Sequence, residues 1–117
     1  ARIQFGKAIS EYQLIQSKLA KMATELTAAR LLLYRAAYEH DHGKERITLE
    51  SAMAKSYATE TAQRVIDSAV QIHGGVGALA ESVVDRLYRS VRSLRIYEGT
   101  TEVQELVIAR QLLSRVR

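Results

Sequence analysis

One carboxylate in a glycine-containing turn is the side chain best suited to acid–base chemistry in this 117-residue chain. Glu98 stands between Tyr97 and Gly99, shortly before a helical pattern that begins near Thr101. A carboxylate in such a turn is exposed and mobile enough to reach a substrate proton and act as a general base. A carboxylate before a helix also has an ordinary explanation, because the positive end of the helix dipole stabilises it. The residues alone favour the ordinary explanation and leave the general base open.

The glycine cluster Gly74, Gly75 and Gly77 is a second candidate site. Glycines allow a ligand to approach the backbone closely, and exposed N–H groups there can bind phosphate oxygens. The cluster follows a helical stretch rather than a strand, so it does not match the dinucleotide-binding fingerprint. Taken alone, the pattern is more typical of a glycine that ends a helix.

His40, Asp41 and His42, preceded by Glu39, are residue types that can hold a metal ion. Ligands that alternate within one short turn rarely converge on a single ion, and no distant partner is visible. A solvated helix end explains them better. The chain also has no cysteine, which excludes disulfides, thiolate catalysis and Cys-ligated metal centres. No metal site is therefore expected.

Helices must position these candidates, because apolar residues recur at intervals of three or four along most of the chain. The expected helices cover residues 13–40, 48–72, 82–93 and 101–115. Gly43 ends the first, Thr48 is expected to cap the second, and Thr101 with Gln104 has capping-box spacing. The second stretch is rich in alanine, which allows close helix packing. With no proline in the sequence, we predict an all-α, up-and-down four-helix bundle that forms a single domain, 1–117.

Composition excludes several classes of protein. The chain is 47% hydrophobic and 26% charged, which is normal for a globular domain and argues against disorder. No stretch approaches the roughly 20 continuous apolar residues that a membrane span needs. The net charge of +4 would suit a nucleic-acid partner, but the basic residues are scattered rather than clustered. Neither a membrane span nor a nucleic-acid partner is expected.

Three motifs, taken in order, resemble the C-terminal helical domain of the acyl-CoA dehydrogenase family. The first is Arg-Ile-Gln-Phe-Gly-Lys at 2–7, and the second is Gln-Ile-His-Gly-Gly at 71–75. The third is Arg-Leu-Tyr-Arg at 86–89, which leads into Ile-Tyr-Glu-Gly-Thr at 96–100. The tail Val-Ile-Ala-Arg at 107–110 is also similar to that of the family, so the resemblance covers nearly the whole chain.

The resemblance implies a flavoenzyme that oxidises an acyl-CoA thioester to the 2,3-enoyl-CoA. Glu98 matches the family's usual base, which removes the α-proton while the β-hydrogen leaves as hydride to FAD N5. A backbone N–H at the Glu98 position and a hydroxyl of the flavin's ribityl chain would stabilise the developing enolate oxygen. Contacts with the acyl-CoA substrate are implied for Tyr97, Gly99 and Arg110.

By the same resemblance, three segments would contact FAD. One subunit would contribute the residues of the first segment, Arg2, Phe5 and Gln13. Its partner would hold the adenosine and pyrophosphate with the second, Gln71, Ile72, His73, Gly74 and Gly75. The third follows the base and comprises Thr100, Thr101 and Glu102. FAD in the family lies across a dimer interface and the bundles pack in tetramers, so we expect a homo-oligomer, with electron-transfer flavoprotein as the electron acceptor.

The sequence departs from the family pattern in two places. Ser90 stands where the family usually has an acidic residue, and the segment 76–84 lacks an aromatic residue often found there. These departures leave room for an acyl-CoA oxidase relative. Since the family also has an N-terminal helical domain and a middle β-domain, we expect this chain to be the C-terminal fragment of a larger enzyme and inactive alone. The expected location is the cytoplasm of a bacterium or the mitochondrial matrix of a eukaryote, and a non-catalytic oligomerisation module is the alternative function.

Overall fold

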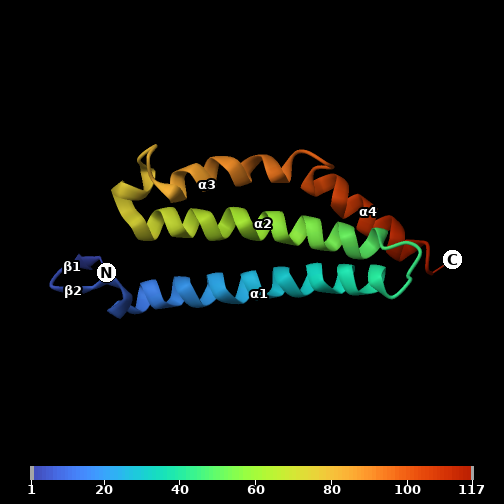
Figure 1. Cartoon of the computed structure of the whole chain (residues 1–117), viewed down its shortest axis with the longest axis horizontal. Helices are drawn as coiled ribbons and strands as arrows, with labels where there is room; N and C mark the ends of the chain where they lie inside the picture. The colour runs from blue at the N-terminus through green and yellow to red at the C-terminus, as the bar shows by residue number, and fades with distance from the viewer. Residues whose placement is uncertain (1, 117) are drawn as a thin grey trace.

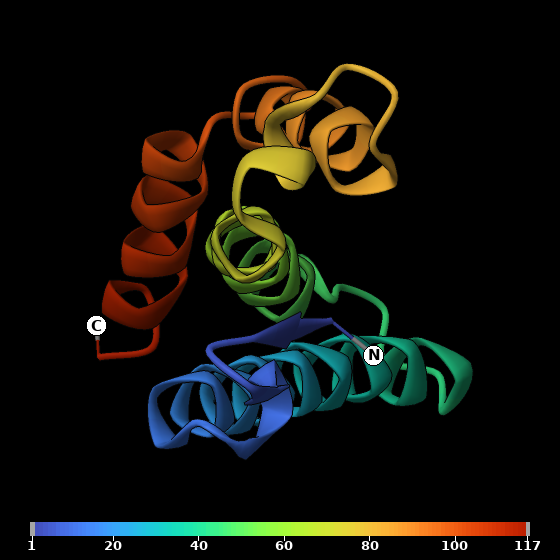
Figure 2. The same cartoon turned by 90° about the vertical axis from the view of Figure 1, so that its left-hand side faces the viewer.

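The computed structural model describes residues 2–116 and shows an elongated, mostly helical molecule of 62 × 26 × 24 Å. Helix α1 (Gln13–Asp41) runs antiparallel to α2 (Thr48–His73). Helices α3 (Val83–Arg92) and α4 (Thr101–Leu113) then follow one another back along the other side of α2 (Figure 1). Viewed end-on, α2 lies between α1 and the α3–α4 layer (Figure 2). The predicted all-α fold with four helices is confirmed.

The helix bounds agree with the sequence pattern to within a few residues, but two predicted caps are wrong. Helix α2 starts at Thr48 itself, preceded by Ile47 as N-cap without a side-chain hydrogen bond. Thr100, not Thr101, caps α4, because its Oγ1 accepts from the Val103 N–H at 3.3 Å. In both cases the N-cap is one residue before the predicted one, which is the usual uncertainty of such patterns.

Short elements absent from the sequence prediction precede α1 or lie between the later helices. Two-residue strands β1 (Ile3–Gln4) and β2 (Lys7–Ala8) pair antiparallel, and 3₁₀ turns occupy η1 (Ile9–Glu11), η2 (Gly74–Ala78) and η3 (Ser93–Arg95). Phe5 and Gly6, with φ of 51° and 82°, make the hairpin turn, which favours left-handed residues. Strands this short carry no readable alternation, so periodicity did not reveal them.

The core is thin and lies mainly where α1 packs on α2. Its buried apolar side chains are mostly small: Ala29, Ala36, Leu49, Ala52, Ala54 and Ile66. Small side chains let the two helix backbones approach closely, as the alanine-rich second stretch predicted. Neither α3 nor α4 contains a buried residue. The thin core leaves many large apolar side chains exposed, among them Leu31, Tyr34 and Tyr38 of α1, at 62–63% exposure.

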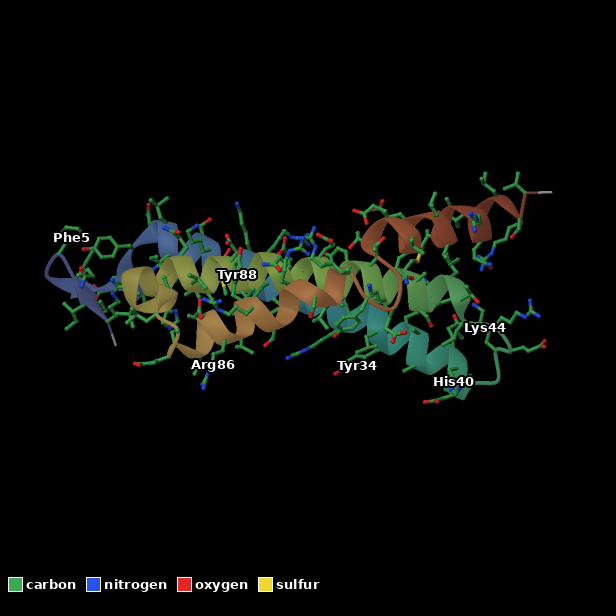
Figure 3. The ribbon with its side chains drawn as sticks, turned by 90° about the horizontal axis from the view of Figure 1, so that it is seen from above. Phe5, Tyr34, His40, Lys44, Arg86 and Tyr88 are labelled. Carbon is green, nitrogen blue, oxygen red and sulfur yellow. The ribbon has the colours of Figure 1, made fainter. Side chains whose placement is uncertain are left out.

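A buried carboxylate ties the loop between α1 and α2 to the start of α2. Glu50 is only 2% exposed and accepts a 2.6 Å hydrogen bond from Lys44 Nζ, with Arg35 at 3.7 Å. The hydrogen bond from Lys44 holds the pKa of Glu50 below its ordinary value, despite a burial that raises it. His40 and Asp41 belong to the solvated end of α1, next to this loop (Figure 3).

No helix in the described residues is both long and apolar enough to cross a membrane. Those same residues contain no group of three or more His, Asp or Glu side chains arranged to hold a metal ion.

The packing after α2 predicts which glycine of the cluster is structural. A Cβ at Gly77, which is buried, would lie 2.7 Å from the Val70 carbonyl oxygen and 2.8 Å from His73 Cβ. We expect Gly77→Ala to lower the free energy of unfolding by about 1–3 kcal/mol, as overpacking does. Gly75→Ala is the matched control, since its Cβ would meet nothing within 4 Å. Chemical denaturation of both variants checks this, and equal stabilities would contradict it.

Candidate functional site

Glu98 lies in a tight turn between η3 and α4 whose backbone is in the left-handed region. Its φ is 55°, and that of the following Gly99 is 87°. A non-glycine residue rarely adopts this conformation, and strain of this kind gathers at functional sites. Glu98 is exposed, and within residues 2–116 neither its carboxylate nor its N–H has a hydrogen-bond partner. The turn therefore presents both groups to the surroundings.

Two side chains hold the backbone of this turn. Gln104 Nε2 donates to the Glu98 carbonyl oxygen at 3.1 Å, and Lys55 Nζ of α2 donates to the Gly99 carbonyl oxygen at 2.5 Å. A Cβ at Gly99 would lie 2.5 Å from Gln104 Nε2, so the glycine makes room for the first of these contacts.

Glu60 of α2 joins the two ends of the segment that contains Glu98. Its Oε1 accepts hydrogen bonds from Arg95 Nε at 2.6 Å and from Thr101 Oγ1 at 2.7 Å. Burial is the largest single influence and raises the pKa of Glu60. The hydrogen bonds from Thr101 and Arg95, with the charges of Arg95 and Arg64, outweigh it and hold that pKa below its ordinary value. Glu60 therefore stays ionised near neutral pH.

The start of α4 carries the third predicted FAD segment. Thr100 is its N-cap, and the pKa of Glu102 is lowered by its own backbone N–H and by the Thr100 hydroxyl. Thr101 turns inward, since its hydroxyl donates to Glu60, so only its oxygen is left to accept from a ligand. Glu102 is exposed. Of the residues predicted to contact substrate, Tyr97 and Gly99 flank Glu98, whereas Arg110 lies near the other end of α4.

The other predicted FAD residues gather at the opposite end of α2. An open pocket of about 710 Å³ lies between the N-terminal hairpin, the start of α1 and the end of α2. It is lined by six of the predicted residues: Arg2, Phe5, Gln13, Gln71, Ile72 and Gly74. His73 and Gly75 are not part of its lining. The hairpin tip with Phe5 lies far from His40 and Lys44 at the other end of the molecule (Figure 3).

Arg2 joins the hairpin to the end of α2. Its guanidinium donates to the carbonyl oxygens of Ile72 (3.2 Å) and His73. A cation is favourable at this negative end of the helix dipole. Gly74, with φ of 63°, ends α2, as the helix-end explanation predicted, and its Cβ would lie 2.9 Å from Arg2 Nη1. The missing side chain thus lets Arg2 lie against the backbone.

One chain does not bring the two regions together. Lys55, which holds the Glu98 turn, and His73, between the pocket residues Ile72 and Gly74, are 18 residues apart on α2, or about 27 Å at 1.5 Å per residue. The resemblance also divided Arg2 and Gln13 from the 71–75 segment, giving them to different subunits. In the structure, residues from both groups line one pocket of a single chain.

Sequence reasoning missed the side chains that support the Glu98 turn, namely Lys55, Glu60, Arg95 and Gln104. The available signal was weak: Lys55 and Glu60 are charged residues within the alanine-rich apolar pattern of α2. Such residues can equally be solvated, and their partners lie 35 to 44 residues away in the chain.

The fold and these two regions define a class of protein: a helical domain with an exposed carboxylate on a restrained turn and, in a separate region, a pocket large enough for a ligand. The chain belongs to the acyl-CoA dehydrogenase family, because residues 1–113 match the family's sequence profile, "Acyl-CoA dehydrogenase, C-terminal domain".

Curated relatives support this assignment. The 3-(aryl)acrylate reductase of Clostridium sporogenes is 51% identical over 112 residues, which are 96% of this chain and 29% of that protein. The caffeyl-CoA reductase-Etf complex subunit CarC of Acetobacterium woodii is 48% identical over 114 residues, or 97% of this chain and 30% of that protein. The chain therefore spans less than a third of the length of either relative.

Two solved structures also support the family assignment. Butyryl-CoA dehydrogenase from Megasphaera elsdenii superposes with a TM-score of 0.92 at 45% identity, covering 96% of this chain and 29% of that one. A structure described as the FAD complex of PigA has a TM-score of 0.91 at 36% identity, covering 98% of this chain and 30% of that one.

The left-handed backbone at Glu98 predicts a gain in stability when the side chain is removed. In Glu98→Gly, relief of the left-handed backbone strain should stabilise the folded state by about 1–2 kcal/mol. The glycine also makes the unfolded chain more flexible, which should offset about 0.4–1 kcal/mol of that gain. We expect the free energy of unfolding to rise by about 0.5–1 kcal/mol in denaturant titrations. Glu102→Gly, in the first turn of α4, is the control and should destabilise. Loss of stability in Glu98→Gly would contradict the strain argument.

The Glu60 contacts predict a stability that depends on pH. A carboxylate whose folded pKa is lowered contributes stability above its unfolded pKa, near 4.5, and loses it as pH falls through the lower folded value. We expect Glu60→Gln to cost about 1–3 kcal/mol at pH 7, and the difference from wild type to shrink below pH 4.5. Thermal unfolding between pH 3 and 7 measures it. A difference that does not change with pH would contradict the assignment.

Proposed function

We propose that this chain is the C-terminal, base-bearing part of an FAD-dependent acyl-CoA dehydrogenase, with Glu98 as the base for the α-proton of an acyl-CoA thioester. One observation carries the proposal: Glu98 is exposed in a strained turn, and the carbonyl oxygens of Glu98 and Gly99 are held by Gln104 and Lys55. Strain that is held by its surroundings is typical of a functional residue. The family assignment supports the same role.

The chain's own groups suit proton abstraction. The α-proton of a thioester is weakly acidic, so removing it requires a positioned base and a hydrogen-bond donor for the developing enolate oxygen. The Glu98 carboxylate would take the proton. The N–H of the same residue, which has no acceptor within residues 2–116, would donate to that oxygen. Tyr97 and Gly99 would border the thioester.

The residues around the 710 Å³ pocket fit FAD. Arg2 supplies a positive charge, Gln13 and Gln71 supply amide donors, and Phe5 with Ile72 supplies apolar surface for a ring. Gly74 keeps the backbone open beside Arg2. When bound, FAD supplies a hydride acceptor for the β-hydrogen of the substrate. The relative described as the FAD complex of PigA supports this ligand.

The separation between the Glu98 turn and this pocket supports a cofactor shared between subunits. Because the two regions of one chain lie about 27 Å apart along α2, they would act on different FAD molecules in a homo-oligomer. Exposed apolar residues of α1, such as Leu31 and Tyr38, offer surface for that association. Thr100, Thr101 and Glu102 would then contact one FAD, and Arg2 with the 71–75 segment another.

The names of two relatives favour the same reaction in the opposite direction, as a reduction. Both are named as reductases, and one belongs to an Etf complex. By microscopic reversibility a carboxylate that removes the α-proton in oxidation returns it in reduction, so Glu98 serves either direction. Electron-transfer flavoprotein is accordingly the proposed electron partner, and the cytoplasm or mitochondrial matrix the proposed location. An acyl-CoA oxidase or a non-catalytic oligomerisation module would share the fold but not this partner.

In the full-length protein, we expect Glu98→Gln to lower the rate of FAD reduction by an acyl-CoA at least about 10³-fold, since the amide cannot accept the proton. Flavin content should stay at the wild-type level, because Glu98 does not line the pocket and is not among the residues proposed to contact FAD. Stopped-flow absorbance of the flavin measures the rate. The matched control is Glu105→Gln, which is also exposed, lies on α4 and is outside the residues proposed to contact FAD or substrate. A Glu98→Gln enzyme with unchanged flavin reduction would refute the base.

A further inference from the structure

Two charged side chains of α2 bind the segment that contains Glu98: one contacts the turn and the other contacts its two flanks. Lys55 donates to the Gly99 carbonyl oxygen at 2.5 Å, and Glu60 accepts from Arg95 and Thr101 on either side of the turn. These contacts join segments 35 to 44 residues apart in the chain. They attach the turn to the central helix of the fold.

The turn needs such attachment. Glu98 has a left-handed backbone at φ 55°, which costs free energy for a residue with a side chain and persists only where the surroundings hold it. Glu98 is exposed, so packing of its own side chain does not hold it. The restraint must come from contacts to the backbone.

Lys55 is the contact that fixes the turn against the rest of the molecule. Gln104 also holds a carbonyl of the turn, but it is part of α4 and would move with it. Glu60 holds the flanking residues Arg95 and Thr101 rather than the turn itself. In the described residues, only Lys55 joins a carbonyl of the Glu98–Gly99 pair to a helix other than α4, and its charge strengthens that hydrogen bond.

We propose that Lys55 is a positioning residue, which holds the Glu98 turn through the Gly99 carbonyl oxygen and so sets where the carboxylate meets the substrate's α-carbon. The inference rests on the proposed role of Glu98 as base. Lys55 takes no part in the proton transfer. Its effect is on geometry, to which such reactions are sensitive: a misplacement of about 1 Å can cost about 100-fold in rate.

The test compares Lys55→Met with Lys44→Met in the full-length protein, with flavin reduction by an acyl-CoA as the readout. Methionine keeps an unbranched stem and removes the ammonium donor. Lys44 is the matched control, because it makes an equally short 2.6 Å hydrogen bond, to Glu50, in the loop before α2. We expect Lys55→Met to lower the rate of reduction per bound flavin about 10- to 100-fold. The acyl-CoA dissociation constant should stay within about twofold, and Lys44→Met should keep the wild-type rate.

An isotope effect separates positioning from general loss of structure. In Lys55→Met the α-deuterium isotope effect on flavin reduction should rise, because proton abstraction becomes the slower event. Lys55→Arg, which keeps a charged donor, should recover part of the rate. A rate per bound flavin within about twofold of wild type, or an unchanged isotope effect, would overturn the proposal.

If Lys55→Met does not assemble, Lys55→Gln takes its place with the same criteria, since its shorter side chain cannot reach the Gly99 carbonyl as the lysine does.

The experiments also distinguish failure of the proposed function from failure of the positioning role. If Glu98→Gln also retains wild-type flavin reduction, the proposed function has failed. If Glu98→Gln is inactive while both Lys55 variants keep the full rate, only the positioning role has failed.

Discussion

Helix α2 packs against each of the other three helices, and both candidate regions depend on that arrangement. Its end at His73 and Gly74 meets the guanidinium of Arg2 and forms one wall of the pocket. Its first half carries Lys55 and Glu60, which hold the link between α3 and α4. Because a helix rises 1.5 Å per residue, α2 also fixes how far apart the two regions lie. The distance is a property of the scaffold and does not depend on the loops.

The conformation of Glu98 follows from the same packing. A glutamate has no intrinsic preference for a left-handed backbone, so the turn exists because neighbouring contacts stabilise it. Gln104 holds it from α4, Lys55 holds it from α2, and Gly99 leaves room for the Gln104 contact. The result is a carboxylate that is exposed on a backbone that is restrained. A flexible loop would offer the same side chain without a fixed position.

The chain buries little apolar surface of its own. Its core is built largely from alanines, Leu49 and Ile66, while α3 and α4 contain no buried residue. Exposed apolar side chains on this scale are typical of surfaces that meet other protein. They agree with a domain whose relatives are more than three times as long, and with the proposed oligomer.

The sequence by itself determined the four helices, because their three-and-four periodicity and the glycine at 43 depend on local physics. It also marked Glu98 and the 71–75 segment through motifs that resemble the family. It missed the hairpin of Ile3–Gln4 and Lys7–Ala8, since strands of two residues carry no pattern. Only the tertiary structure placed Arg2 and Gln13 in one pocket with Gln71 and set the Glu98 turn about 27 Å away along α2. Only the tertiary structure, too, assigned Lys55 and Glu60 to that turn, because a hydrogen bond across 35 to 44 residues is decided by how helices pack, which local sequence does not encode.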